Sequence, residues 1–318
     1  MLDDKKRSST LEIHLANPRG FCAGVDRAIE MVELALKKWG PPIYVRHEIV
    51  HNKHVVNDLT EKGAIFVESL DECPSDRPVL FSAHGVPKSV PEKAKNRQMI
   101  YVDATCPLVT KVHNEIKRFY EKGYQIIMIG HKDHPETIGT MGQLPKDAVL
   151  LVENKDDVKK LNPKNTKKLA YVTQTTLSVD DTKEIAEALN IRFPEIENPK
   201  KEDICYATTN RQEEVKKIVG KVDMFLVVGS ENSSNSQRLV DVAKSGGCKE
   251  AYLIEDKTKI NWEKLSKIKS LGLTSGASAP DHLVQEVIKS IQNKFNTKII
   301  SDTTRKELIE FKVPPILR

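Results

Sequence analysis

Short strand-like runs alternate with amphipathic helical runs along nearly the whole chain of 318 residues. The strand-like runs are rich in β-branched and aliphatic residues, and the helical runs repeat apolar residues at spacings of three and four. Parallel strands need such long crossovers, so the alternation predicts an α/β fold with mostly parallel sheets. The predicted strands are LEIHLA, IYVRHE, VLFSAHG, MIYVDA, QIIMIGH, VLLVE, LAYVTQ, MFLVVGS, AYLIE and SLGLTSG, and the clearest helices are VDRAIEMVELALKKWG, PLVTKVHNEIKRFYEKG, VDDTKEIAEALNIRF and NRQEEVKKIVGKV.

The alternation contains a weak internal repeat marked by cysteine. Three predicted helices begin just after Cys22, Cys106 and Cys205, and each is followed by a strand that runs into a polar loop. The intervals between these cysteines are about the size of a small domain. We therefore expect three pseudo-symmetric α/β lobes around a central cavity. The expected parts are a loose N-terminal tail at 1–10, lobes at 11–105, 106–201 and 202–292, and a C-terminal tail at 293–318 that packs back on another lobe.

The cysteine usage argues against a disulfide framework and against a compact zinc-finger or ferredoxin motif. The chain has five cysteines, an odd number, and no two of them form a CxxC pair. Any metal site must therefore be assembled from distant segments. No apolar run is long enough to span a bilayer, and the N-terminal MLDDKKRSST lacks the apolar core of a secretory signal. We expect a cytoplasmic protein with no membrane partner.

The charge pattern favours a small anionic ligand over a nucleic acid. The formal net charge is +5, but the basic residues are dispersed among acidic ones, as in EDKTKINWEKLSKIK. Dispersed charges of both signs are typical of solvated faces. Only 5% of the residues are aromatic, and no RNA- or DNA-binding motif is found, so we expect no nucleic-acid partner. The modest positive balance suits an anionic small substrate.

Cys22, Cys106 and Cys205 are the candidate metal ligands. Parallel α/β sheets bind ligands at the carboxyl ends of their strands, and a thiol just before a helix is favoured as a thiolate by the helix N-terminus. Three thiolates suit an iron–sulfur cluster with one open iron, and a zinc ion with one open position is an alternative. A cysteine can equally be a small buried hydrophobe. We assign no role to Cys73 and Cys248, which lack the pre-helix context.

A second group of polar residues suits a diphosphate. Imidazole N–H groups, and polar loops that open a helix, both bind phosphate oxygens. Taken singly, Ser278 can be a helix N-cap, and the SSNS segment that contains Ser233, Ser234 and Asn235 can be a plain turn. No Walker loop and no GxGxxG segment occurs, so nucleotide binding has no direct support. The candidate substrate-binding residues are His51, His84, Ser233, Ser234, Asn235 and Ser278.

Glu136, in the segment GHKDHPETIGT, is the candidate proton donor. A carboxyl group in a closed, partly apolar pocket has a raised pKa and can donate a proton near neutral pH. His134 and Thr175 would complete a proton relay with it. The alternative is that Glu136 completes a turn or caps a helix.

Nine segments of the chain resemble, in order and with matching spacing, the 4-hydroxy-3-methylbut-2-enyl diphosphate reductases, the last enzymes of the non-mevalonate isoprenoid pathway. The resemblance runs from about residue 11 to about residue 290, and its motifs are long and specific. The segments are NPRGFCAGVDRAI, YVRHEIVHN, FSAHGV, DATCPLVTKVH, GHKDHPETIGTMGQ, VTQTTLSVDDT, DICYATTNRQ, VVGSENSSNS and TSGASAPD.

The resemblance implies three lobes around a cavity that contains a 4Fe–4S cluster. It implies that the three candidate cysteines bind this cluster, that the six candidate substrate-binding residues hold the diphosphate, and that His134, Glu136 and Thr175 lie near the hydroxymethyl end of the substrate. The implied reaction is a two-electron reductive dehydroxylation to isopentenyl and dimethylallyl diphosphate, with ferredoxin or flavodoxin as electron donor. Two alternatives stay open: a zinc-dependent diphosphate hydrolase or lyase, and a non-catalytic iron–sulfur sensor that binds a metabolite.

Overall fold

The strands of the chain form three parallel sheets. The structure is a computed structural model that describes residues 7–301 and 306–318. In these residues every pairing between named strands is parallel, which confirms the expected α/β class. Each of the ten predicted strand runs overlaps one observed strand, whereas β3 and β12 were not predicted.

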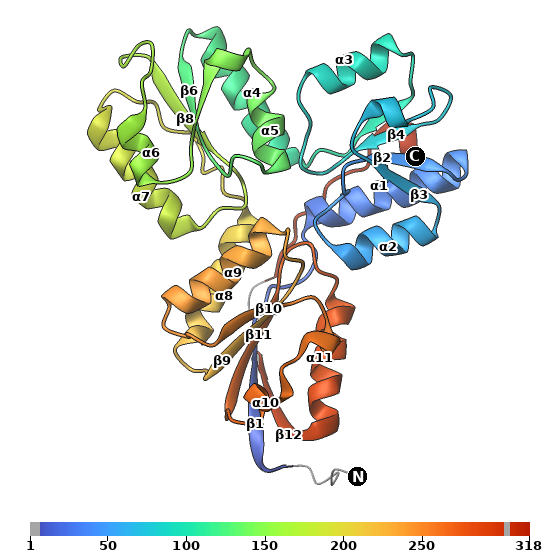
Figure 1. The fold of residues 1–318 in the computed structure, drawn as a ribbon, viewed down its shortest axis with the longest axis vertical. Coiled ribbons are helices and arrows are strands. Elements are labelled where there is room, and N and C mark those ends of the chain that lie inside the picture. Colours follow the sequence, from blue (N-terminus) through green and yellow to red (C-terminus); the bar gives the residue numbers. More distant parts are fainter. Residues whose placement is uncertain (1–6, 302–305) are drawn as a thin grey trace. The chain divides into compact units, whose positions relative to one another are not determined.

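Sheet A has the strand order β10-β9-β11-β1-β12 and is covered by helices on both faces (Figure 1). Met224, Leu226 and Val228 of β9 pack into one apolar cluster with α11. Phe225 and Val227, which point to the other face, pack with α8 and α9. A sheet buried on both faces needs the continuous apolar run that MFLVV provides. Its elements are β1 (Arg7–Leu15), α8 (Tyr206–Val219), β9 (Met224–Val228), α9 (Ser234–Ser245), β10 (Ala251–Ile254), α10 (Trp262–Leu265), β11 (Ser270–Ser275), α11 (Asp281–Lys294) and β12 (Phe295–Ser301).

Sheet B has the order β3-β2-β4-β5. Its longest helix, α1, buries Ala28, Met31, Val32 and Ala35, the three-and-four spacing of an amphipathic helix. The elements that build this part of the chain are α1 (Ala23–Trp39), β2 (Ile43–Arg46), α2 (Lys53–Glu61), β3 (Ala64–Val67), β4 (Val79–Phe81), α3 (Ser89–Asn96) and β5 (Tyr101–Asp103).

Sheet C has the order β7-β6-β8. Ile127 and Ile129 of β6 pack toward α7, and Ile126 and Met128 pack toward α4. Its elements are α4 (Pro107–Glu121), β6 (Gln125–Ile129), α5 (Pro135–Met141), β7 (Val149–Val152), α6 (Lys155–Lys160), β8 (Leu169–Thr173) and α7 (Val179–Arg192). Short 3-10 helices lie at Leu70–Glu72, Lys146–Ala148, Lys257–Lys259 and Pro315–Leu317.

The chain divides into two compact units. Unit 1 contains the N-terminal segment through Cys22, His51–Lys53 and Tyr206–Ile309, and it holds sheet A. Unit 2 contains Ala23–Val50, His54–Cys205 and Glu310–Arg318, and it holds sheets B and C. The predicted lobe boundaries at 11–105, 106–201 and 202–292 stay a prediction.

The two ends of the chain differ from these predicted boundaries. β1, expected in the first lobe, pairs with β11 and β12 in sheet A. Residues 7–10 of the expected loose tail extend β1, while residues 1–6 lie outside the described residues. The expected C-terminal tail includes β12, and the carbonyl groups of Lys312 and Ile316 accept hydrogen bonds from side chains of α1. These contacts join segments far apart in sequence, which a local pattern does not report.

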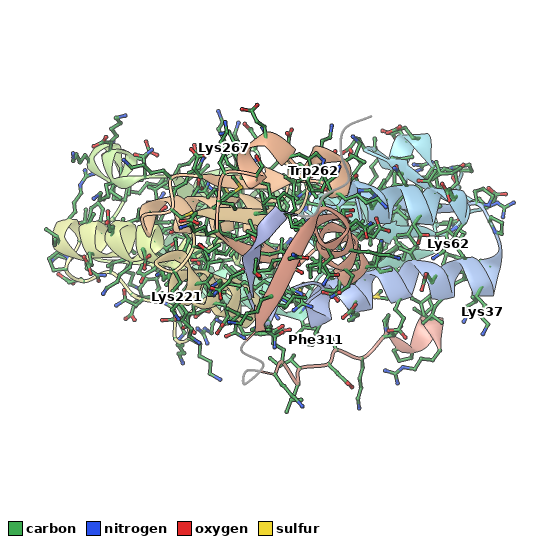
Figure 2. The ribbon with its side chains drawn as sticks, turned by 90° about the horizontal axis from the view of Figure 1, so that it is seen from below. Lys37, Lys62, Lys221, Trp262, Lys267 and Phe311 are labelled. Atoms are coloured by element: carbon green, nitrogen blue, oxygen red, sulfur yellow. The ribbon has the colours of Figure 1, made fainter. Side chains whose placement is uncertain are left out.

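Four of the dispersed lysines lie at the surface, as expected of solvated faces. Lys37, Lys62, Lys221 and Lys267 are exposed, and Figure 2 labels their side chains. Within residues 7–301 and 306–318, no helix has both the length and the apolar character needed to cross a membrane.

Candidate active site

The three candidate cysteines occupy equivalent positions at the starts of helices. α1 begins directly after Cys22, α8 begins directly after Cys205, and Cys106 is the N-cap of α4. All three side chains are partly exposed. Each cysteine backbone N–H donates to a carbonyl oxygen in a loop that follows a strand. These bonds join Cys22 to Ala277 (3.1 Å), Cys106 to Ala83 (2.9 Å) and Cys205 to Thr175 (3.1 Å).

Cys73 and Cys248 differ from these three in their surroundings. Both are packed into apolar clusters, and burial raises the pKa of each thiol above its usual value. No disulfide joins any of the five cysteines, all of which lie in the part of the chain that the structure describes. Three partly exposed thiols at helix N-termini fit a thiolate-bound metal group, whereas the two buried thiols fit apolar packing.

Ser233 and Ser278 form a buried hydroxyl pair in unit 1. The Ser233 Oγ caps α9 by accepting from the N–H of Ser236 (3.3 Å), and it lies 3.4 Å from the Ser278 Oγ. The Ser278 Oγ donates to the backbone carbonyl of His51 (2.9 Å). The N-cap alternative for Ser278 is wrong, because the N-cap of α11 is Pro280. Ser233, for which the sequence offered a plain turn, is a helix N-cap instead.

Asn235 is held rigidly beside this pair. Its Oδ1 accepts from the N–H of Ala277 (2.9 Å), and its Nδ2 donates to the Thr208 Oγ1 (3.2 Å). Ser234, the first residue of α9, is partly exposed. Hydroxyl groups and an oriented amide at the N-terminus of a helix suit an anion, because the helix dipole and the N–H groups favour negative charge.

Glu136 is a buried carboxyl group in the first turn of α5, with 3% of its surface exposed. The N–H and the Oγ1 of Thr175 donate to its two oxygens, at 2.6 and 2.9 Å. Burial raises the pKa of Glu136 to about 7, against the opposing effect of the two Thr175 bonds, and the charge of Asp203 raises it further. A carboxyl group that titrates near neutral pH can hold a proton and release it.

Two histidines of unit 2, His134 and His84, lie beside each other at the start of α5. The His134 Nδ1 caps α5 by accepting from the N–H of Glu136 (3.1 Å), so the proton of its neutral ring is on Nε2. The His84 ring packs edge-on against His134, with centroids 5.9 Å apart, and its Nδ1 lies 3.3 Å from the Ser82 Oγ. The sequence left open that Glu136 caps a helix. In the structure the N-cap of α5 is His134.

Two buried polar residues near Glu136 were not predicted. The Gln174 Oε1 accepts from the Thr137 Oγ1 (3.2 Å). Asp203 pairs with Lys111 (3.0 Å), and burial raises the pKa of Asp203 to about 6. Their positions in the sequence could have identified them, because Gln174 follows a predicted strand and Asp203 lies just before Cys205.

The candidate residues fall into two sets, one in each unit. Unit 1 contains the imidazole, hydroxyl and amide groups that suit a diphosphate, namely His51, Ser233, Ser234, Asn235 and Ser278, together with Cys22. Unit 2 contains the groups that suit proton transfer, namely His134, Glu136 and Thr175, together with His84, Cys106 and Cys205.

The chain matches proteins of known name over nearly its whole length. A family model described as "LytB protein" matches residues 13–292. A relative from Ruegeria sp. (strain TM1040) is 61% identical over 308 residues, which cover 97% of this chain and 98% of the relative. One from Paracoccus denitrificans is 56% identical over 315 residues, or 99% of each chain. Both are named 4-hydroxy-3-methylbut-2-enyl diphosphate reductase.

Solved structures of the same kind of enzyme resemble this fold. The structure of the E-1-hydroxy-2-methyl-but-2-enyl-4-diphosphate reductase from Plasmodium falciparum superimposes with a TM-score of 0.92 at 40% identity, covering 97% of both chains. A second, described as the terminal enzyme of the non-mevalonate pathway, has a TM-score of 0.63 at 32% identity and covers 89% of this chain and 99% of that one.

Proposed function

The chain belongs to the LytB protein family of 4-hydroxy-3-methylbut-2-enyl diphosphate reductases, and from this premise we propose which of its residues carry out the reaction. The chain is an oxidoreductase. The reaction consumes two electrons and two protons, replaces the allylic hydroxyl group of the substrate by hydrogen, and releases water. Its products are isopentenyl diphosphate and dimethylallyl diphosphate.

Cys22, Cys106 and Cys205 hold a 4Fe–4S cluster with one iron open. The support is their common position, since each thiol is partly exposed and lies where helix N–H groups favour a negative sulfur. When bound, such a cluster supplies the two electrons and a Lewis-acidic iron for the substrate hydroxyl group.

Glu136 donates the protons, and its burial is the observation that carries this assignment. A pKa of about 7 keeps a large share of the carboxyl groups protonated at neutral pH, where an exposed glutamate has lost its proton. The Thr175 hydroxyl orients this carboxyl group through a 2.9 Å bond. The Nε2–H of His134 provides a second donor for the departing hydroxyl oxygen.

The diphosphate is held by hydroxyl, amide and imidazole donors. In unit 1 these are the hydroxyl groups of Ser233, Ser234 and Ser278, the amide of Asn235 and the ring of His51, and in unit 2 the ring of His84. Binding energy from this end of the substrate positions the reacting carbon, which lies at the other end. Ferredoxin or flavodoxin supplies the electrons, and the enzyme works in the cytoplasm.

Anaerobic purification and cysteine variants test this assignment. The protein is expected to be brown, to contain iron and sulfide in equal amounts, and to reduce the hydroxymethylbutenyl diphosphate with a strong chemical reductant. Cys106→Ser should lower the iron and sulfide content and abolish turnover. The matched controls Cys73→Ser and Cys248→Ser should keep both, because these thiols lie in apolar clusters.

Two results would contradict the proposal. A colourless protein that contains zinc and stays active would indicate a diphosphate hydrolase or lyase. A brown protein that binds the substrate but does not reduce it, even with a strong reductant, would indicate an iron–sulfur sensor.

A further inference from the structure

Three partly or fully buried cations recur at nearly the same distance after the three candidate cysteines. Each lies on the helix that begins at its cysteine, five residues after the cysteine in α1 and α4 and six in α8. Unlike the exposed lysines of the surface, these side chains reach into the fold. The three cations are Arg27 after Cys22, Lys111 after Cys106 and Arg211 after Cys205.

Arg27, on the helix after Cys22, reaches the chain just before Cys106. Its Nη1 donates to the carbonyl oxygens of Ala104 (3.3 Å) and Thr105 (3.2 Å). Burial lowers the pKa of Arg27, while the charge of Cys106 opposes this lowering, so the guanidinium lies within electrostatic reach of that thiol.

Lys111, on the helix after Cys106, reaches the chain just before Cys205. Its Nζ donates to the carbonyl oxygens of Lys201 and Glu202, both at 2.9 Å. It also pairs at 3.0 Å with the carboxylate of Asp203, whose side chain is fully buried. Lys111 therefore bonds to three consecutive residues, 201–203.

Arg211, on the helix after Cys205, reaches the chain just before Cys22. Its Nη2 donates to the carbonyl oxygen of Gly20 (2.8 Å), and its side chain is fully buried. Glu307 balances its charge, with an Nη1–Oε1 distance of 3.1 Å. The three contacts thus follow one cyclic order along the chain, from Cys22 to Cys106, from Cys106 to Cys205 and from Cys205 back to Cys22.

We propose that Arg27, Lys111 and Arg211 are positioning residues of the metal centre, each tying the helix that begins at one cysteine to the backbone before the next. The proposal rests on the proposed function, because it requires the three cysteines to be the ligands. These hydrogen bonds fix the backbone on both sides of each thiol. Residues that hydrogen-bond around metal ligands commonly orient the ligands in this way. The positive charge of Arg27 also favours an added electron, because charge and hydrogen bonding around a cluster set its reduction potential. The charges of Lys111 and Arg211 are offset by Asp203 and Glu307.

Paired substitutions separate the effect of the hydrogen bonds to the backbone from the effect of the positive charge. Arg27→Gln and Lys111→Gln remove the charge but keep an N–H donor for the carbonyl oxygens, whereas Arg27→Met and Lys111→Met remove both. In the purified holoenzyme we expect a more negative midpoint potential in both Arg27 variants. Only the Met variants should also lose the cluster to a chelator about 10-fold faster than the wild type.

Lys38→Met is the matched control. Lys38 lies on the same helix as Arg27 and also donates to a backbone carbonyl, that of Ile316 (2.7 Å), but at the other end of the helix. This variant should keep the potential and the chelation half-life of the wild type. For Arg211, the double variant Arg211→Gln with Glu307→Gln avoids a buried unpaired charge, and thermal unfolding of the cluster-free protein reports whether its fold is kept.

The outcomes separate this proposal from the proposed function. Wild-type potential and cluster half-life in the Arg27 and Lys111 variants would overturn the positioning role while leaving the reductase assignment intact. An equal shift in Lys38→Met would also overturn it, since the effect would then be one of general charge. A wild-type protein without iron and sulfide would overturn both proposals.

Discussion

The loops after β6 and after β9 share one backbone plan but carry different chemistry. Each begins with a glycine directly after the strand, Gly130 or Gly229, and the next helix begins five residues later. The helix caps are His134 and Ser233, each four residues after the glycine.

The same plan places Glu136 and Asn235 at the second position of their helices. Glu136 is buried with a raised pKa, whereas Asn235 is a neutral amide fixed by two hydrogen bonds. The same loop geometry therefore presents a carboxyl group with a raised pKa in unit 2 and, in unit 1, a neutral amide that we propose binds the diphosphate. At this second helix position a single substitution can exchange the two side chains.

Glu136→Gln makes the β6 loop resemble the β9 loop and should have the largest effect. Removal of the acid is expected to lower kcat by about 100- to 10,000-fold, because general acid catalysis contributes that much. The iron and sulfide content should stay at the wild-type level. The control is Asp133→Asn, an exposed carboxylate in the same loop, which should keep full turnover. Full activity in Glu136→Gln would rule out the acid role.

The stability of the cluster-free protein should depend on pH through Glu136. Its pKa is about 7 in the fold and about 4.5 when exposed, so the folded state holds a proton that the unfolded state has released between these values. Stability should therefore fall as pH rises from about 4.5 to about 7, by about 3 kcal/mol. Urea unfolding across this range should show a smaller fall in Glu136→Gln. An equal fall in both proteins would contradict the raised pKa.

Asn235→Asp makes the converse exchange in the β9 loop. The new carboxylate keeps an acceptor for the Ala277 N–H but repels the diphosphate. We expect KM for the substrate to rise about 30-fold, a cost of about 2 kcal/mol, with a smaller change in kcat. Steady-state kinetics at two salt concentrations measure the effect, which added salt should reduce. An unchanged KM would remove Asn235 from the diphosphate site.

Alanine at the two loop glycines should have the smallest effect. A Cβ at Gly229 would lie 2.3 Å from the Ser236 Oγ, and one at Gly130 would lie 2.7 Å from the Thr137 Oγ1. We expect a loss of about 1 to 2 kcal/mol for each, larger for Gly229→Ala, because overpacking forces neighbours to shift. Gly220→Ala is the control, since nothing lies within 4 Å of its Cβ position. If Gly130→Ala and Gly229→Ala had the same denaturant midpoint as Gly220→Ala, the two loops would not be tightly packed around these glycines.

Local patterns predicted much of this molecule, because its strands are short and apolar and its polar loops directly follow them. The burial of Glu136 beside Thr175 was also expected, since a carboxylate between a proline and small residues had no obvious surface position. Patterns did not predict the pairing of β1 with β11 and β12, which depends on contacts across most of the chain. They also did not predict the ties of Arg27 and Lys111, which resemble solvated charges until their partners are seen.

The place of β1 in sheet A has a consequence for synthesis of the protein. β1 is made first, yet both of its partner strands, β11 and β12, lie near the end of the chain. A ribosome releases the chain from its N-terminus, so β1 has no partner strand until nearly all of the protein has been translated. Cys22, whose N–H is anchored to Ala277, reaches its final position only then. Loading of the metal group that we propose on Cys22, Cys106 and Cys205 is therefore expected only after β11 and the loop with Ala277 have been synthesised.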